Sequence, residues 1–521
     1  MKFFTIFGKI LTMKKYLLFS LLAFSNIDAA VLYVNSSATG SNNGLSWANA
    51  YTDLQTAMSN AIFGDEIWVA SGVYKATSTT DRTISFNMKN GVNLYGGFSG
   101  TETSVAQRNI SQNPTTLSGD IGAIGDNTDN TNTILKIIST TSGITVDGFR
   151  IISGRGGGSA GISLNNNTGI INIKNCYFYD NFGSTAGAIF QAYQGNYTVN
   201  VSNCDFISNI AVNGVIFSDQ SSNNNLNITN SRFKGSVAGG IAVLSFEAAN
   251  FTMDRCIVTN NTSTQSSIVH IAAKASARIS NSLFVGNSYS ENALALYSLS
   301  GISQILENIT VAHNKKVFLT NTFETAVYSV NGQVKVYNSI IYGNTNSSNN
   351  DQIDAGNTVS HSIVENGYAT GTGILNANPM FVNPNTLSAA PFDCTSYNYQ
   401  LLAGSPAINT GNNTFVTQSQ DLLGNGRTSG SNVDMGAYEK TGNMSVDEAV
   451  NKTKSLFYDF KNENIIVKNG RNNNVIVIYD QSGRAVLKAG VNNSFSLSQL
   501  SSGVYYVNLQ DTKENIKIIK K

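Results

Sequence analysis

The side chains of this chain that could bind a ligand fall at one position of a repeat. Arg150, Tyr177, Asp205 and Arg232 are spaced by roughly 27 residues, an interval typical of stacked repeat architectures. If each repeat forms one coil of a stack, these four side chains point outward from neighbouring coils. Two guanidinium groups, a phenol and a carboxylate offer donors and acceptors for sugar hydroxyls, so we expect a ligand-binding patch here.

Catalysis would need more than this patch provides. A glycoside hydrolase uses two carboxylates that flank the bond it breaks, whereas a polysaccharide lyase uses a base and often a calcium ion. The patch contains one carboxylate, Asp205, and the outward position three residues earlier places no two acids on adjacent coils. His270, His313 and His361 fall at unrelated repeat positions and are expected to be structural. We therefore assign no catalytic residue, no cofactor and no metal.

The repeat is marked by polar corner residues roughly 23 to 30 residues apart. The corners are Gly148, Asn175, Asn203, Asn230, Arg255, Asn281, Asn308, Asn338 and His361. After Gly, Asn best tolerates the left-handed backbone conformation that a sharp bend requires. We expect Asn175, Asn203, Asn230, Asn281, Asn308 and Asn338 to form a structural ladder, with side-chain amides hydrogen-bonded from coil to coil.

Apolar residues alternate with polar ones on both sides of each corner. The residues three places after the corners are Ile151, Phe178, Phe206, Phe233, Val258, Phe284, Val311, Ile341 and Val364. Because side chains alternate across a strand, these residues point inward. Each repeat has room for two or three short strands and for no crossover helix. The sequence predicts an all-β fold, a single-stranded right-handed parallel β-helix over residues 31–376.

Cysteine usage is consistent with a buried core. Cys176, Cys204 and Cys256 follow their corners directly and share one inward position, so we expect buried thiols. A Cys176–Cys204 bridge between adjacent coils is the alternative. Cys394 stands alone, and no spacing matches a set of metal ligands.

The N-terminus carries the pattern of a secretory signal peptide over residues 1–30. Lys14 and Lys15 precede a short apolar run, and cleavage is expected near Ala30. Thr52 is predicted to N-cap a short amphipathic helix, with the Gln55 side chain reaching back in a capping box. This helix would cover the open end of the stack, which is otherwise an exposed sheet edge.

Composition limits the partners. The chain has 521 residues, a net charge of +1 and 12% charged residues, so we expect no nucleic-acid partner. After the signal peptide, no segment is long and apolar enough to predict a transmembrane helix.

Several stretches resemble secreted β-helix proteins. Residues 65–74 and 92–102 resemble the N-terminal part of bacterial right-handed β-helix proteins of the pectin-lyase-like superfamily. Residues 178–181, 206–209 and 284–287 match the F-x-x-N element of polymorphic outer-membrane proteins, and Gly239-Gly240-Ile241 matches their companion G-G-[AILV] element. These resemblances imply a secreted or surface-exposed β-helix.

The section at 377–440 breaks the repeat period with Gly and Pro residues. It resembles the choice-of-anchor Q module that closes many secreted β-helix proteins, through residues 378–383, 399–411, 421–427 and 433–439. We expect a C-terminal cap of the β-helix in which Asp421, Asp434, Glu439 and Arg427 are ion-paired.

Residues 441–455 are predicted to be a linker, and 456–521 a small β-sandwich. The latter resembles the type IX secretion C-terminal sorting domain, through Tyr479-Asp480, Gly483-Arg484, the L-x-x-G-V-Y run at 500–505 and the basic C-terminus. The usual Y-P-N-P is replaced by residues 456–460. The resemblance implies the type IX secretion machinery as partner, and a secreted or outer cell-surface location.

Two functions are consistent with these observations. The first is a non-catalytic adhesion or glycan-binding protein, whose ligand would be an extracellular polysaccharide or a host or cell-surface glycan. The alternative is a polysaccharide lyase or glycoside hydrolase with an active site built from loops. A groove with at least two carboxylates, or carboxylates beside Arg or Lys, would favour the enzyme.

Overall fold

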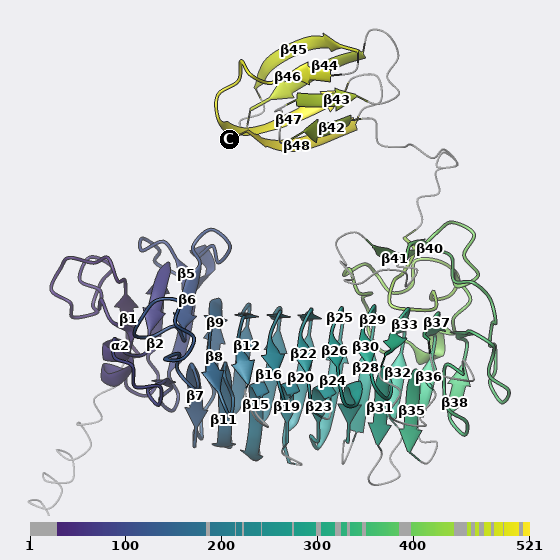
Figure 1. Ribbon diagram of the computed structural model, residues 1–521, viewed down its shortest axis with the longest axis horizontal. Helices are drawn as coiled ribbons and strands as arrows, with labels where there is room; N and C mark the ends of the chain where they lie inside the picture. Colours follow the sequence, from purple (N-terminus) through teal and green to yellow (C-terminus); the bar gives the residue numbers. More distant parts are fainter. Residues whose placement is uncertain are drawn as a thin grey trace, which may run out of the picture. The chain divides into compact units, whose positions relative to one another are not determined.

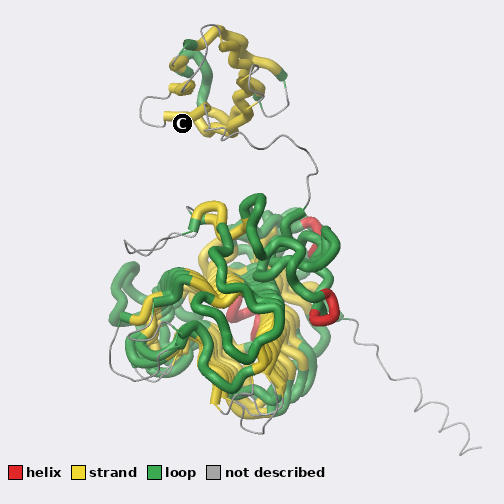
Figure 2. Tube along the Cα trace, turned by 90° about the vertical axis from the view of Figure 1, so that its right-hand side faces the viewer, coloured by secondary structure: helices red, strands yellow, loops and turns green. Residues whose placement is uncertain are grey.

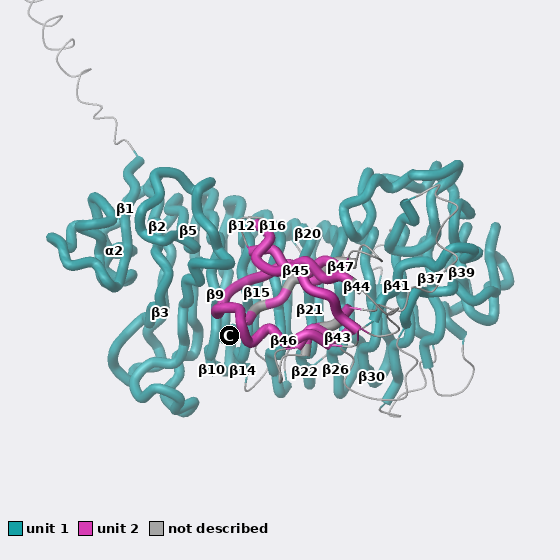
Figure 3. The backbone as a smooth tube through the Cα atoms, turned by 90° about the horizontal axis from the view of Figure 1, so that it is seen from above, with its two compact units in different colours: residues 1–442 teal, residues 443–521 magenta. Residues whose placement is uncertain are grey.

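The chain folds into two compact units, residues 1–442 and 443–521, which are coloured separately in Figure 3. The computed structural model describes residues 29–520 except for 184–187, 214, 221–222, 241, 273–275, 298–303, 318–324, 331–333, 346–350, 385–396, 442–455, 460–463, 468–473, 481–483, 493 and 510–513. The predicted signal peptide up to residue 28, Cys394, Ile241 and most of the predicted linker therefore lie outside the described residues.

Unit 1 contains a parallel β-helix, as predicted, whose coils stack side by side along one axis (Figure 1). Four parallel sheets run the length of the stack, and we call them sheets A to D. Figure 2 looks along the stack and shows the strands of successive coils superposed. Two or three strands per coil were expected. The structure adds a fourth, two-residue strand in sheet D, because a further corner follows sheet B.

The strand bounds are as follows. Sheet A contains β1 (Val31–Val34), β2 (Glu66–Ala70), β5 (Asn93–Phe98), β8 (Ile144–Asp147), β12 (Ile170–Lys174), β16 (Thr198–Ser202), β20 (Asn225–Thr229), β24 (Asn250–Asp254), β28 (Ser276–Ser280), β32 (Gln304–Glu307), β36 (Val334–Tyr337) and β38 (Thr358–Ser360). Sheet B contains β3 (Gly72–Lys75), β6 (Thr115–Ser118), β9 (Phe149–Ile152), β13 (Tyr177–Tyr179), β17 (Asp205–Ile207), β21 (Arg232–Lys234), β25 (Ile257–Thr259), β29 (Leu283–Val285), β33 (Thr310–Ala312), β37 (Ile340–Tyr342) and β39 (Ile363–Val364).

Sheets C and D close each coil. Sheet C contains β4 (Phe86–Asn87), β7 (Leu135–Ile138), β11 (Ile162–Asn167), β15 (Ala188–Gly195), β19 (Val215–Asp219), β23 (Ala242–Phe246), β27 (Ser267–Ile271), β31 (Leu294–Tyr297) and β35 (Val327–Val330). Sheet D contains β10 (Arg155–Gly156), β14 (Phe182–Gly183), β18 (Ile210–Ala211), β22 (Val237–Ala238), β26 (Thr262–Ser263), β30 (Ser288–Tyr289) and β34 (Lys315–Lys316).

The predicted inward ladder forms the core. Phe178 pairs in register with Phe206, and Phe206 with Phe233. Their rings stack at centroid distances of 4.3 and 4.8 Å, and all three side chains are fully buried. Burying one such side chain stabilises the fold by roughly 1.5–3 kcal/mol, so this ladder sets the register of the coils.

The N-terminal helix is present, but a different residue caps it. Helix α2 spans Leu54–Asn60, and its N-cap is Asp53, whose carboxylate accepts the Thr56 backbone N–H at 2.8 Å. The predicted cap, Thr52, lies one residue too early. The Gln55 amide does not reach back; it donates to the backbone carbonyls of Ala76 and Ser85, at 3.0 Å each. The helix thus covers the first coils, with Leu54, Ala57 and Met58 buried.

The segment after the last coil folds back onto the outward face of sheet B. Strands β40 (Phe381–Asn383) and β41 (Asn398–Leu401) form an antiparallel pair, and the 3-10 turn η2 spans Asn413–Phe415. Phe381, Tyr399 and Met435 of this segment form a second apolar cluster with outward residues of sheet B, among them Leu283 and Ile340.

Unit 2 has two antiparallel sheets around one apolar core, as expected for a small sandwich. The first contains β42 (Leu456–Asp459), β43 (Asn464–Val467) and β46 (Ser494–Ser496). The second contains β44 (Asn474–Tyr479), β45 (Ala485–Val491), β47 (Gly503–Leu509) and β48 (Glu514–Lys520). In the part of the chain that is described, no helix has the length and hydropathy needed to cross a membrane.

Candidate functional site

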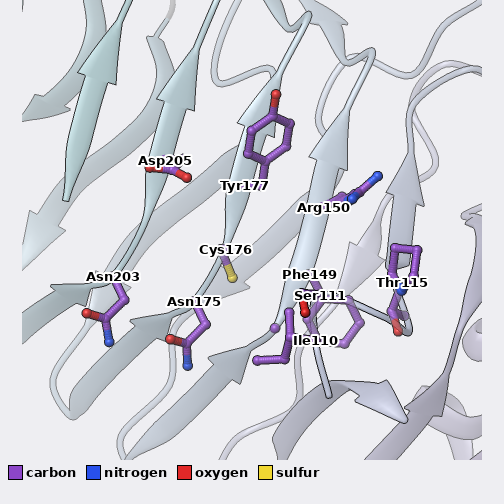
Figure 4. Close-up of a pocket in the computed structure, with 12 residues that line it drawn as sticks. Ile110, Ser111, Thr115, Phe149, Arg150, Asn175, Cys176, Tyr177, Asn203 and Asp205 are labelled. Carbon is purple, nitrogen blue, oxygen red and sulfur yellow. The ribbon is translucent and has the colours of Figure 1, made fainter. Parts of the chain in front are cut away.

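A pocket of about 520 Å³ opens on the outward face of sheet B, over β9, β13 and β17 (Figure 4). It contains three of the four predicted ligand-binding residues, Arg150, Tyr177 and Asp205. The remaining lining residues are Ile110, Ser111, Pro114, Thr115, Gly148, Phe149, Asn175, Cys176 and Asn203. Repeat spacing thus identified the strands of this pocket.

The four predicted residues form one straight column, which we call the polar column. Arg150 pairs in register with Tyr177, Tyr177 with Asp205, and Asp205 with Arg232. Because neighbouring strands lie about 4.8 Å apart, the column spans roughly 14 Å along the stack. Arg232 does not line the pocket itself and stands one coil beyond it.

Asp205 and Arg232 form a two-contact ion pair. The Arg232 Nε and Nη2 atoms lie 2.6 Å from the two carboxylate oxygens of Asp205. Since the Arg232 side chain is 55% exposed, the pair contributes little to stability. Its effect is on orientation, because a planar guanidinium that contacts both oxygens fixes the carboxylate.

The rest of the column offers a cation and an aromatic face. Arg150 is exposed and makes no ion pair with any residue that is described. Tyr177 is half-buried, and its ring lies against that of Tyr179 at 5.8 Å. Burial raises the pKa of the Tyr177 phenol, the charges of Tyr179 and Asp205 raise it further, and Arg150 and Arg232 oppose them. The phenol therefore stays protonated at neutral pH and can donate a hydrogen bond.

A loop that precedes β6 builds one wall of the pocket. It follows the 3-10 turn η1 (Val105–Gln107) and supplies Ile110, Ser111 and Pro114. Arg108 anchors it through a 2.5 Å ion pair with Asp147 at the end of β8. The repeat pattern does not predict these loop residues, because they lie outside the repeat and reach the pocket only through packing.

The floor of the pocket requires a close approach of the backbone. Gly148 has a φ of +87°, and a Cβ atom there would come within 2.9 Å of the Gly96 carbonyl oxygen. Cys176 beside it is buried, and its thiol donates to the Lys174 carbonyl at 3.2 Å. Cys176, Cys204 and Cys256 are free thiols, so the alternative Cys176–Cys204 bridge is not formed. Burial raises the pKa of Cys204 and Cys256, so these core thiols stay protonated at neutral pH and are poor nucleophiles.

The histidines lie away from this pocket. His313 is buried, with Nδ1 3.0 Å from the Tyr399 hydroxyl, and burial lowers its pKa to about 4. His361 occupies a corner, with Nδ1 2.8 Å from Ser360 Oγ. His270 packs against Tyr297, and burial lowers its pKa. Within the described residues, no group of acids, histidines and cysteines is arranged to hold a metal ion.

The six corner asparagines bend the chain. Asn175, Asn203, Asn230, Asn281, Asn308 and Asn338 have φ values between 46° and 54°. Their side chains differ from the expected amide ladder: Asn175 donates to Asp147 Oδ1 at 2.7 Å, and Asn338 donates to the Asn412 carbonyl at 3.0 Å.

An amide ladder does exist six residues further along each repeat, and one serine interrupts it. It contains Asn181, Asn209, Asn261, Asn287, Asn314 and Asn344, with Ser236 between the second and the third. These side chains are buried, because the corner after sheet B points them into the stack. The F-x-x-N spacing is the sequence pattern that could have predicted this ladder. Its Phe packs in the core, and its Asn side chain makes hydrogen bonds at the corner.

The acidic residues of the C-terminal segment surround one buried arginine. Arg427 donates to the backbone carbonyls of Asp434 and Gly436, and burial lowers its pKa while the charges of Glu439, Asp421 and Asp434 oppose that shift. Asp421 accepts the N–H groups of Leu423, Asn425 and Glu439. Backbone N–H groups thus occupy these carboxylates. The expected ion pairing is wrong for the described residues, because Arg427 Nη2 contacts backbone carbonyls and Nε and Nη1 have no hydrogen-bond partner. Ala30, the expected cleavage site, precedes β1 and donates its N–H to Asp65 Oδ1 at 2.9 Å.

Comparison with known proteins gives one family match, in unit 2. Residues 461–521 match the secretion system C-terminal sorting domain. No curated protein matches the chain. Among solved structures, pectate lyase Pel9A is similar with 17% identity and a TM-score of 0.44, covering 80% of this chain and 98% of that one. An alginate lyase from Paenibacillus sp. str. FPU-7 has 12% identity and a TM-score of 0.29, covering 61% and 96%. The activities in those names belong to those proteins.

The sorting domain identifies the route that this chain takes. It implies contact with the type IX secretion machinery. The protein is therefore a parallel β-helix with a type IX C-terminal sorting domain, and it is secreted or displayed on the cell surface.

Proposed function

We propose that this protein binds an extracellular glycan without cleaving it, in the pocket over β9, β13 and β17. The observation that carries the proposal is the polar column, in which Arg150, Tyr177, Asp205 and Arg232 face outward in one line. Guanidinium and carboxylate groups match the donors and acceptors of sugar hydroxyls. The rings of Tyr177 and Tyr179 add amphipathic aromatic surface, with an apolar body and a polar tip.

The charge of the column favours an acidic glycan. Arg150 and Arg232 are cationic and Asp205 is anionic, and Asp205 is already paired with Arg232. Arg150 supplies the cation that would pair with a carboxylate or sulfate of the ligand, because its planar guanidinium suits two-contact recognition of such groups.

A carboxylate beside an arginine, one of the arrangements expected of an enzyme, is present in Asp205 and Arg232, but the details of this pair favour binding over catalysis. A retaining glycoside hydrolase needs two carboxyl groups about 5–5.5 Å apart, and the pocket lining has one. That carboxylate accepts two N–H donors from Arg232 at 2.6 Å, so both of its oxygens are already hydrogen-bonded. Asp205 is thus poorly suited to act as the general base of a lyase.

The test is incubation of the mature chain, which is the protein without its predicted signal peptide, with a panel of acidic and neutral glycans. Retention and product release are followed in parallel. We expect retention without release. Arg150→Ala should weaken retention by about 10- to 100-fold, because a charge-assisted hydrogen bond contributes about 1.5–3 kcal/mol. Lys335→Ala on β36 of sheet A is the matched control for loss of one positive charge and should bind like the wild type. Release of shortened or unsaturated products that Tyr177→Ala abolishes would overturn the proposal in favour of an enzyme.

A further inference from the structure

The outward face of sheet B is open over part of its length and covered over the rest. Arg150 and Arg232 are exposed, and Tyr177 and Asp205 are half-buried. The next outward residues in the same column are Ile257, Leu283, Thr310, Ile340 and Ile363. Ile257 is half-buried and the other four are buried. The change from polar to mainly apolar side chains thus coincides with the change from open to covered.

The C-terminal segment is the cover on that side. The Ala437 N–H donates to Thr310 Oγ1 at 3.0 Å, and a Cβ on Gly436 would lie 2.7 Å from Ile340 Cδ1. Leu422 packs against the same apolar cluster, as does Ile257 at its edge. The Gln420 side chain accepts from Arg255, one coil beyond Arg232. Figure 1 shows this segment, with β40 and β41, over β29, β33 and β37.

The opposite end of the open region is covered as well. Thr116 of β6 pairs in register with Arg150, and it is only 7% exposed. The loop before β6 stands beside it and presents Ile110, Ser111 and Pro114 to the pocket. The ion pair between Arg108 and Asp147, whose side chains are each 9% exposed, holds the loop there.

Four strands of sheet B therefore remain open between two walls: β9, β13, β17 and β21. Building on the proposed function, we infer that this groove is closed at both ends along the stack. It takes a short oligosaccharide or the end of a glycan chain, and it excludes the interior of a long polymer. A ligand that contacts several members of the polar column lies along the stack, where the walls limit its length to roughly 14 Å plus the reach of the end residues.

A polymer laid along the strands would avoid both walls but would contact one or two members of the column. It would lose the contacts that lie about 4.8 Å apart on neighbouring coils. The groove therefore selects ligands by length, because the residues that bind the ligand are spaced along the stack between the two walls.

The experiment uses the mature chain with oligosaccharide ladders of hyaluronan, alginate and polygalacturonate, together with their parent polymers. We expect affinity to rise with chain length until the groove is full and then to stay constant. We also compare the retained polymer with the same mass of that polymer after partial hydrolysis. The amount of protein bound should rise in proportion to the number of chain ends. Affinity that keeps rising with length, or equal binding before and after hydrolysis, would overturn the inference and leave the proposed function intact. Failure of every probe to bind would count against the proposed function itself.

Two variants make the wall itself testable. Ile110→Gly removes the apolar side chain of the loop wall and should move the plateau to longer oligosaccharides. Ile124→Gly removes the same side chain from a position that is 88% exposed and does not line the pocket, and should leave the plateau unchanged. An unchanged plateau in Ile110→Gly with normal unfolding behaviour would show that the loop does not limit ligand length.

Discussion

The Arg108 guanidinium and the Asp147 carboxylate lie 2.5 Å apart and connect the loop before β6 to the corner between β8 and β9. Asp147 also accepts the Asn175 amide at 2.7 Å, and Arg108 donates to the Gly96 carbonyl at 3.0 Å. One ion pair thus connects the loop wall of the groove to two successive corners of the stack.

Arg108→Ala should release this loop while the stack stays folded. Removing one partner of a largely buried pair leaves the other charge uncompensated, which costs about 3 kcal/mol locally. We expect faster proteolytic cleavage between residues 104 and 114 and weaker glycan retention. Asp147→Asn keeps one acceptor oxygen and should show a smaller effect. Wild-type cleavage rates in Arg108→Ala would contradict this role.

We expect the buried amide ladder to contribute more to stability than the half-buried asparagine pairs on the outward face of sheet A. Asn261 donates to Asn287 Oδ1 and to the Phe233 carbonyl, at 3.1 and 2.8 Å, and accepts the Ser236 N–H at 3.1 Å. Asn261→Ala leaves these buried groups unsatisfied, so we expect a loss of about 2–4 kcal/mol in urea unfolding. Asn200→Ala is the matched control: its amide bonds Asn172 on the outward face of sheet A, and its loss should cost less than about 1 kcal/mol. Equal costs would refute the distinction.

Acid should weaken the fold through His313. Burial lowers its folded-state pKa from 6.5 to about 4, so the unfolded chain takes up this proton first as the pH falls. The stability that depends on neutral His313 is complete above about pH 6.5 and decreases down to about pH 4, by about 3 kcal/mol in total. His313→Asn keeps a residue that tolerates the positive φ and should remove this component. Urea titrations of both proteins at pH 7.5 and 4.5 measure it; parallel losses in the two would rule it out.

Asp354 should give stability the opposite pH dependence, because its ionisation weakens the fold as the pH rises. Burial raises its pKa to about 6, so its ionised form costs stability at neutral and alkaline pH. Its carboxylate accepts the Ser329 N–H at 3.0 Å and the Asn357 amide at 2.8 Å, and the oxygen of an asparagine can keep an acceptor there. We expect Asp354→Asn to be about 1–2 kcal/mol more stable than the wild type at pH 8, after allowance for solvent screening. The difference should vanish near pH 4. Thermal unfolding at the two pH values checks this, and a variant less stable at pH 8 would contradict it.

Much of the fold could be predicted because the rules that produce it are local. Side-chain alternation places Phe178, Phe206 and Phe233 on one face, and stacking identical coils must then bury them together. The left-handed preference of Asn locates the bends at Asn175 and Asn203. The polar column follows from the same alternation, since an outward position in one coil is outward in the next.

Local rules did not decide between two equally periodic asparagine sets. Asn175 and Asn181 recur with the same spacing, and only the orientation of the second corner points Asn181 into the stack, where its amide must be hydrogen-bonded. The N-cap likewise depended on which residue stands directly before the first helical turn. Asp53 has the extended backbone of an N-cap there, so it caps α2 in place of Thr52.

By itself, the sequence determined the coil period, the inward ladder, the outward column and the C-terminal sorting domain, because each depends on residues close together in the chain or on a repeated position. The tertiary structure decided which part of sheet B stays open. That depends on the packing of Ile110 and of residues 397–440 against coils far away in the sequence. Only this non-local packing turns a column of four polar side chains into a groove with two ends.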